Sequence, residues 1–173
     1  MFKWLTVFLY VGFIFSTLSA VPGVWNDLSA KYGRMPKYAL YCVFAISLTI
    51  CLYRMIWRVK KRYMSHYILF TAAILGYAYL FWSLFKLPVE QVHLMEYGFL
   101  SYLVYLAAKN GNLLKTYIKV FLLVASIGYI DELIQFFLPD RRYDIKDVLV
   151  NALSGLLGIF LIHSLGIGAK SES

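Results

Sequence analysis

Acidic and amide side chains are concentrated between residues 128 and 158, in two segments that are otherwise apolar enough to lie in a bilayer. In chain order these side chains belong to Asp131, Glu132, Gln135, Asp144, Asp147 and Asn151. Carboxylates accept and release protons and bind cations, and amides orient polar ligands through hydrogen bonds. Because an ionisable group is costly inside a membrane, the groups found there usually serve a function. These residues are therefore the first candidates for a site.

Helical spacing places the candidates on particular faces. Asp131 and Gln135 are four residues apart and share a face, while Glu132 points about 100° away from Asp131. A polar and small-residue stripe follows steps of three and four down the last segment, through Asp144, Asp147, Asn151, Gly155 and Gly158. Small residues let membrane helices approach closely, so these glycines are expected to bring the last helix close to a neighbour at Gly128.

A second group of candidates lies upstream. His93 and Glu96 are three residues apart, so both side chains project from one face of the helix expected there. Together with Asp131 and Glu132 they form the expected acid/base or ligand cluster. The other expected substrate contacts, of which the cationic ones suit a phosphate group, are Lys86, Gln135, Arg141, Arg142, Asp144, Asp147 and Asn151.

Several candidates have an equally good structural interpretation. Asp144 follows a turn, so it is also explained as the N-cap of a helix, with Asp147 in the favourable field of the helix start. For Asn151 a hydrogen bond that joins two helices is as good an explanation as a role in the site. For Arg141 and Arg142 the structural interpretation is that both side chains are solvated in an outer turn and contact no ligand.

Asp131 and Glu132 are harder to explain structurally. Adjacent buried carboxylates each need a partner or a proton, and a structural ion pair with Arg141 or Lys86 is the alternative to a site. His93 alone suits an interfacial histidine, and only its helical spacing to Glu96 makes a functional role equally well supported.

The elements that must position these residues are membrane-spanning helices. Of the 173 residues, 61% are hydrophobic and 15% are charged, which exceeds the apolar content of an ordinary soluble domain. About six apolar runs are each long enough to cross a hydrocarbon core of about 30 Å. They cover residues 2–21, 38–57, 67–85, 91–108, 117–138 and 144–165. The sequence therefore predicts an all-α membrane protein, a bundle of about six transmembrane helices in a single domain over residues 1–173.

The distribution of Lys and Arg predicts the orientation of this bundle. Pro22 and Gly23 are expected to end the first span, and an even number of spans places both termini on one side. That side carries ten Lys and Arg residues against seven on the other, so both termini are expected to be cytoplasmic. The end of the fifth span and the starts of the fourth and sixth then reach the outer face, where the candidate residues form one site.

The formal net charge of +8 does not indicate a nucleic acid partner. The Lys and Arg residues fall mostly in short gaps between apolar runs, where membrane topology places them. Membrane lipids, anionic ones in particular, are therefore the expected partners.

The candidate residues also resemble the signature of VanZ-like membrane proteins. The resemblance rests on Asp131-Glu132-x-x-Gln135 with Pro139, Arg141, Asp144, Asp147, Asn151, Gly155 and Gly158, and upstream on Lys86, His93, Glu96 and Tyr97. It covers most of the chain and is most specific over residues 86–165. It implies a multi-pass protein of the bacterial cytoplasmic membrane, in a family of which some members lower susceptibility to glycopeptide antibiotics such as teicoplanin.

Two classes of function remain open. The first is a non-enzymatic envelope protein that binds a lipid or a cell-wall precursor at the outer leaflet. The second is an intramembrane enzyme in which His93 and the carboxylates hold a divalent cation or relay protons. A transporter is a weaker third option, because the acids cluster at one end of the spans instead of lining their full depth. The family resemblance favours the first class.

Overall fold

The computed structural model describes residues 2–57, 59, 63–84, 88–138 and 143–167. All regular secondary structure within these residues is helical, which confirms the predicted all-α class. The elements are α1 (Phe2–Thr17), α2 (Ala20–Tyr32), α3 (Met35–Trp57), α4 (Met64–Tyr79), the π-helical turn η1 (Leu80–Leu84), α5 (Pro88–Ala108), α6 (Leu113–Phe136) and α7 (Ile145–Ser164). Lys86, Arg141 and Arg142, which the sequence predicts as substrate contacts, lie outside the described residues.

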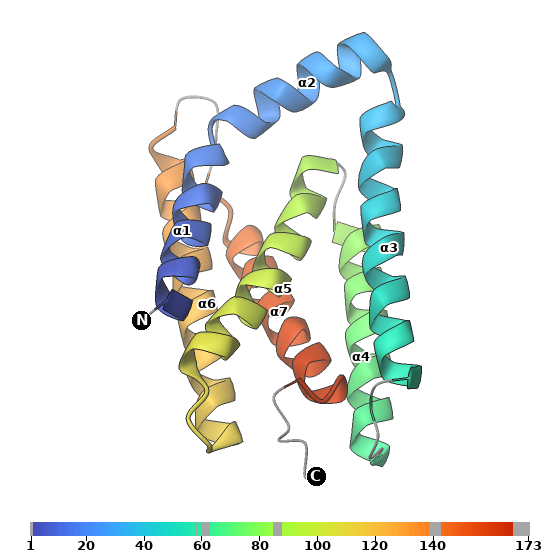
Figure 1. Ribbon diagram of the computed structural model, residues 1–173. Coiled ribbons are helices and arrows are strands. Elements are labelled where there is room, and N and C mark those ends of the chain that lie inside the picture. Colours follow the sequence, from blue (N-terminus) through green and yellow to red (C-terminus); the bar gives the residue numbers. More distant parts are fainter. Residues whose placement is uncertain (1, 58, 60–62, 85–87, 139–142, 168–173) are drawn as a thin grey trace.

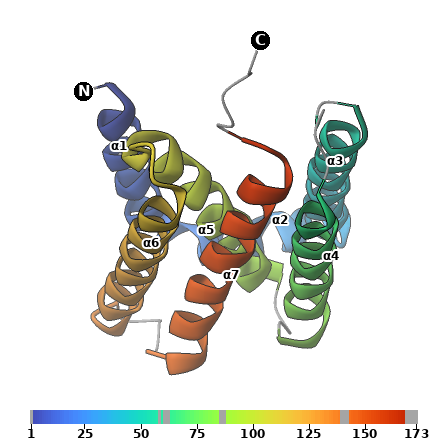
Figure 2. The same cartoon turned by 90° about the horizontal axis from the view of Figure 1, so that it is seen from below.

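Helix α7 occupies the centre of the bundle (Figure 1). It packs against α4, α5 and α6, and α5 packs in turn against α1 and α6. Seen from below, α1 and α6 lie on one side of α7 and α3 and α4 lie together on the other, while α5 crosses α7 (Figure 2). Helix α2 runs across one end of the bundle, from the end of α1 to the start of α3 (Figure 1).

Four helical segments are long and apolar enough to cross a membrane, counting only the described residues. They are Met35–Trp57, Met64–Trp82, Leu113–Phe136 and Ile145–Ser164. Helix α5 is not among them, because Glu90, His93 and Glu96 lower the apolar content of its first half. The membrane character predicted from composition is supported, whereas the six-span bundle and the cytoplasmic termini stay predictions.

The first predicted span, residues 2–21, is divided into two helices. Helix α1 ends at Thr17 and α2 begins at Ala20, with a bend of 59° between them, so the expectation that Pro22 and Gly23 end the helix is wrong. The hydroxyl of Thr17 donates to two carbonyls of the preceding turn at 3.1 and 2.8 Å, a contact that often bends helices. Pro22 is tolerated in the first turn of α2, where its missing N–H has no intrahelical partner to lose.

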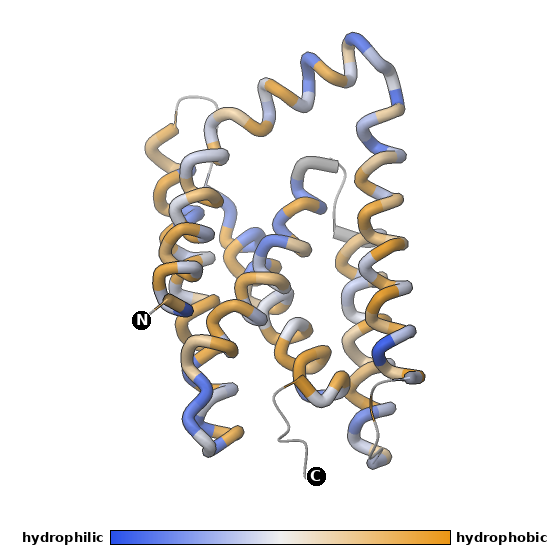
Figure 3. Tube along the Cα trace, viewed as in Figure 1, coloured by the Kyte–Doolittle hydropathy of each residue, from blue (hydrophilic) through white to orange (hydrophobic). Residues whose placement is uncertain are grey.

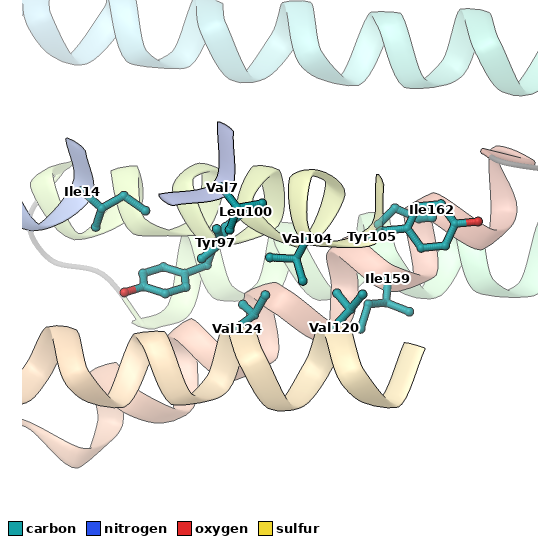
Figure 4. Packing of buried hydrophobic residues seen from close by; sticks show 10 residues of the cluster. All are labelled: Val7, Ile14, Tyr97, Leu100, Val104, Tyr105, Val120, Val124, Ile159 and Ile162. Carbon is teal, nitrogen blue, oxygen red and sulfur yellow. The ribbon is translucent and has the colours of Figure 1, made fainter. Parts of the chain in front are cut away.

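An apolar core fills the space between α1, α5, α6 and α7 (Figure 4). Its buried members are Val7, Ile14, Tyr97, Leu100, Val104, Tyr105, Val120, Val124, Ile159 and Ile162. By contrast, only 6% of the apolar window of α3 is buried, against 44% for α7. Most apolar side chains of α3 therefore point away from the bundle, as in a helix that contacts lipid tails.

Small residues bring α7 close to its neighbours. A Cβ atom at Gly158 would lie 2.9 Å from the carbonyl oxygen of Gly98 in α5, and one at Gly155 would lie 2.7 Å from Cγ1 of Val124 in α6. The predicted close approach of α7 to its neighbours is confirmed. At Gly128 of α6, where the approach was expected, Cβ of Asn151 in α7 lies 2.8 Å from where a Cβ at Gly128 would be.

Candidate functional site

Polar residues of α5, α6 and α7 meet near the end of the bundle that α2 crosses. At this end α5 begins, α6 ends and α7 begins (Figure 1). Hydrophilic residues gather there, at the start of α5 and beside it (Figure 3). Asp131 lies one and a half turns before the end of α6 at Phe136, a rise of about 7.5 Å. The site is therefore inside the bundle, near one end.

Asp131 is fully buried and is contacted by two residues of α5. The hydroxyl of Tyr97 donates a hydrogen bond of 2.7 Å to Oδ2 of Asp131. Nδ1 of His93 lies 3.8 Å from the same oxygen and 3.2 Å from Oε2 of Glu96. The prediction that His93 and Glu96 project together is confirmed. Nδ1 of His93 thus lies near both carboxylates but makes no hydrogen bond within the described residues. The three groups are an acid and base cluster of the kind used in proton transfer.

Glu132 is also buried and faces α7. Its Oε1 accepts a hydrogen bond of 3.1 Å from Nε2 of Gln135. Asp147 of α7 lies near enough for its charge to act on Glu132, as does Asp131. The two adjacent carboxylates thus face different helices, as their offset of about 100° predicts.

Asn151 lies deeper between α6 and α7. Its side chain is 1% exposed, and its Cβ packs at Gly128, where the ring of Tyr97 also lies close. Nδ2 of Asn151 has no hydrogen-bond partner within the described residues. The hydrogen bond between helices that the sequence allows for this residue is therefore not made by Nδ2.

Buried polar atoms without a partner are concentrated in this site. Within the described part of the chain they include Oδ1 of Asp131, Oε2 of Glu132 and Nδ2 of Asn151. Buried polar atoms in native proteins are nearly always paired with protein, water or a ligand. This set of atoms therefore has the hydrogen-bonding capacity to hold a ligand.

Asp144 has a capping role. Its Oδ1 accepts a hydrogen bond of 2.8 Å from the backbone N–H of Lys146, and its side chain is exposed at the start of α7. The capping interpretation of Asp144 is confirmed. Asp144 lies outside the buried group formed by Asp131, Glu132 and Asn151.

No three His, Cys, Asp or Glu side chains among the described residues are grouped so that they could hold a metal ion. His93, Glu96 and Asp131 are linked only through Nδ1 of His93. The hypothesis that the site holds a divalent cation therefore depends on the types of its residues and not on their placement.

The family model described as VanZ/LLP1 matches residues 3–166, nearly the whole chain. The chain belongs to the VanZ/LLP1 family. The resemblance seen in the sequence motifs is thereby confirmed. No match is found among curated proteins or among solved structures.

Tyr97 contacts the candidate residue Asp131 but is not among the site residues predicted from the sequence. It lies four residues after His93, and this helical spacing is the signal that places both on the face towards Asp131. Two buried serines in this VanZ/LLP1 protein also join α5 to α7. Ser154 donates to the carbonyl oxygen of Leu94 at 3.1 Å, and Ser101 donates to that of Gly155 at 3.0 Å.

Proposed function

We propose that this protein binds a lipid or a lipid-linked cell-wall precursor on the outer side of the bacterial cytoplasmic membrane. The observation that carries the proposal is the pair Asp131 and Glu132, two adjacent buried carboxylates that each keep one oxygen without a partner. Leaving such groups unpaired is costly to folding. Direct contact with a ligand accounts for their presence better than a structural role does.

The location of the site supports a ligand with a lipid anchor. The carboxylates lie close to the ends of α5, α6 and α7, about 7.5 Å inside the bundle. A headgroup at the membrane surface reaches this depth while its tails stay in the hydrocarbon. Lys86, Arg141 and Arg142 are proposed, from the sequence, as contacts to a phosphate of the same ligand.

Family membership supports a role in lowering susceptibility to teicoplanin. A protein that binds or alters a cell-wall precursor on the outer face acts where glycopeptide antibiotics act. The proposal is tested by expressing the protein in a susceptible bacterium and measuring the minimal inhibitory concentration of teicoplanin. The wild type is expected to raise it.

Two conservative variants show whether the site carries this effect. Asp131→Asn and Glu132→Gln keep the side-chain shape and remove one charge, and both are expected to return the inhibitory concentration to that of cells without the protein. Asp27→Asn removes a carboxylate from the exposed surface of α2 and serves as the matched control. Full resistance in both site variants, at equal membrane levels, would overturn the proposal.

A second candidate function is an intramembrane enzyme that uses acid/base catalysis on a lipid-linked substrate. It is favoured by the contacts of His93, whose Nδ1 lies 3.2 Å from Glu96 and 3.8 Å from Asp131. The test is to incubate the purified protein with a radiolabelled lipid-linked precursor and to follow product by chromatography. An enzyme gives product that is lost in His93→Gln while binding is kept. Binding without product, with or without added Mg²⁺ or Zn²⁺, supports the first function.

A further inference from the structure

We infer that the group recognised by the buried site is a primary ammonium carried by a lipid headgroup. The inference rests on the proposed function, because it names the ligand chemistry of the same site. Two observations lead to it: the balance of charge around Asp131 and Glu132, and the one oxygen of each carboxylate that has no partner.

The described residues of the buried site carry an excess of acidic groups. Three carboxyl groups surround one group that can be positively charged. The carboxyl groups belong to Glu96, Asp131 and Glu132, and the group they surround is the His93 imidazole. Nδ1 of His93 lies closer to Glu96 than to Asp131, at 3.2 Å against 3.8 Å, so any positive charge on it is shared with Glu96 first. Charges interact strongly where water is excluded, so these described groups favour a cation over an anion beside the two carboxylates.

The hydrogen bonds that the carboxylates already have come from neutral donors. Tyr97 donates to Asp131, and Gln135 donates to Glu132. Each carboxylate therefore keeps one acceptor without a partner, Oδ1 of Asp131 and Oε2 of Glu132. A ligand that fits must bring donors and positive charge together.

A primary ammonium meets both requirements. It carries a compact positive charge and three N–H donors. A phosphate brings only acceptors and negative charge, and a quaternary ammonium brings charge without donors. The N–H donors of a primary ammonium match the two unpaired acceptors, Oδ1 of Asp131 and Oε2 of Glu132.

Lipid titrations followed by native mass spectrometry test the inference on the purified full-length protein in detergent. Phosphatidylethanolamine, its mono- and dimethylated forms, phosphatidylcholine and phosphatidylglycerol are compared with identical acyl chains. Phosphatidylethanolamine is expected to bind about tenfold more tightly than phosphatidylcholine, with affinity falling as methyl groups replace donors. Phosphatidylglycerol is expected to bind no more tightly than phosphatidylcholine.

Soluble ethanolamine distinguishes a lipid ligand from a free amine. It is expected to displace phosphatidylethanolamine only when present in at least about hundredfold excess, because it lacks the tails and the phosphate. Displacement at equimolar concentration would show that the amine comes from solution and would overturn the lipid assignment.

Variants connect the preference to the carboxylates. Asp131→Asn and Glu132→Gln are expected to bind phosphatidylethanolamine no better than phosphatidylcholine, whereas Asp27→Asn keeps the full preference. Size-exclusion profiles and helical circular dichroism establish that the variants are folded. The methylation series uses the wild type alone, so the inference stays testable if a variant does not fold.

The outcomes separate failure of the inference from failure of the proposed function. Equal affinity of the wild type for phosphatidylethanolamine and phosphatidylcholine would overturn the ammonium assignment. If another lipid then binds in a manner that depends on Asp131, the proposed function stands without the ammonium. If the binding of no lipid depends on Asp131 or Glu132, both fail.

Discussion

The hydroxyl of Tyr97 donates a hydrogen bond of 2.7 Å to Oδ2 of Asp131 and so joins α5 to α6 inside the bundle. Both side chains are 0% exposed, and hydrogen bonds to a charged group are shorter and stronger than neutral ones. The bond holds the Asp131 carboxylate by one oxygen and leaves Oδ1 without a partner. Tyr97 is therefore a positioning residue for the carboxylate that the proposed site depends on.

Replacing Tyr97 tests this role. Tyr97→Phe keeps the ring in the core and removes the donor, and it is expected to lower the free energy of unfolding by about 1–3 kcal/mol, because a buried acceptor is left unpaired. Chemical denaturation in detergent measures the change. Tyr105→Phe is the matched control, since Tyr105 is 1% exposed in the same core and its hydroxyl makes no hydrogen bond within the described residues. Equal losses in the two variants would contradict the role of Tyr97.

The contact of Gly158 with Gly98 makes a second prediction. A Cβ at Gly158 would lie 2.9 Å from a backbone oxygen, which cannot move as the end of a side chain can. Gly158→Ala is therefore expected to push α7 away from α5 and to destabilise the protein by about 1–3 kcal/mol. Gly12→Ala is the control, because no atom lies within 4 Å of the added Cβ. Thermal unfolding curves of the two variants in detergent should differ clearly, and coincident curves would show that the α5–α7 contact is looser than described.

Local periodicity was enough to predict which residues share a helical face. The fifth predicted span, 117–138, overlaps α6 (Leu113–Phe136), and the sorting of Asp131 and Glu132 onto different sides follows from the geometry of one helix. The contact between His93 and Glu96 follows in the same way, because both residues lie on α5. Features that depend on a single helix are therefore readable from the sequence.

Features that depend on how helices pack together are readable only in part. The glycines of α7 and Gly128 predict a close approach, but the contact of Gly158 with Gly98 of α5 is not predicted, because the register between helices is set by the whole core. The break after Thr17 is a local feature that the sequence pattern does not predict. Pro22 is the stronger sequence signal for a helix end, yet the bend lies before it, where Thr17 bonds back to the preceding turn.

Two substitutions at Asp144 separate its capping role from a role in ligand binding. Asp144→Ala is expected to destabilise the protein by about 1 kcal/mol, because the N–H of Lys146 loses its partner. Asp144→Asn keeps the acceptor and removes the charge, so it is expected to keep both stability and resistance. Denaturation midpoints and teicoplanin inhibitory concentrations are measured for both variants. Loss of resistance in a stable Asp144→Asn protein would instead assign the carboxylate to the ligand.

Cysteine labelling tests the orientation on which the outer location of the site depends. Helix α2 crosses the end of the bundle that holds the site, and the connection between α5 and α6 lies at the opposite end (Figure 1). The bias of ten Lys and Arg residues against seven predicts that the α2 end faces outwards. With Cys42 and Cys51 replaced by Ala, an impermeant thiol reagent should label Asn26→Cys in intact cells, since Asn26 is exposed on α2. Lys109→Cys, exposed just after α5, should react only after the cells are permeabilised. The reverse pattern would place the carboxylate site on the cytoplasmic side, where a glycopeptide antibiotic does not act, and the resistance role would fail with it.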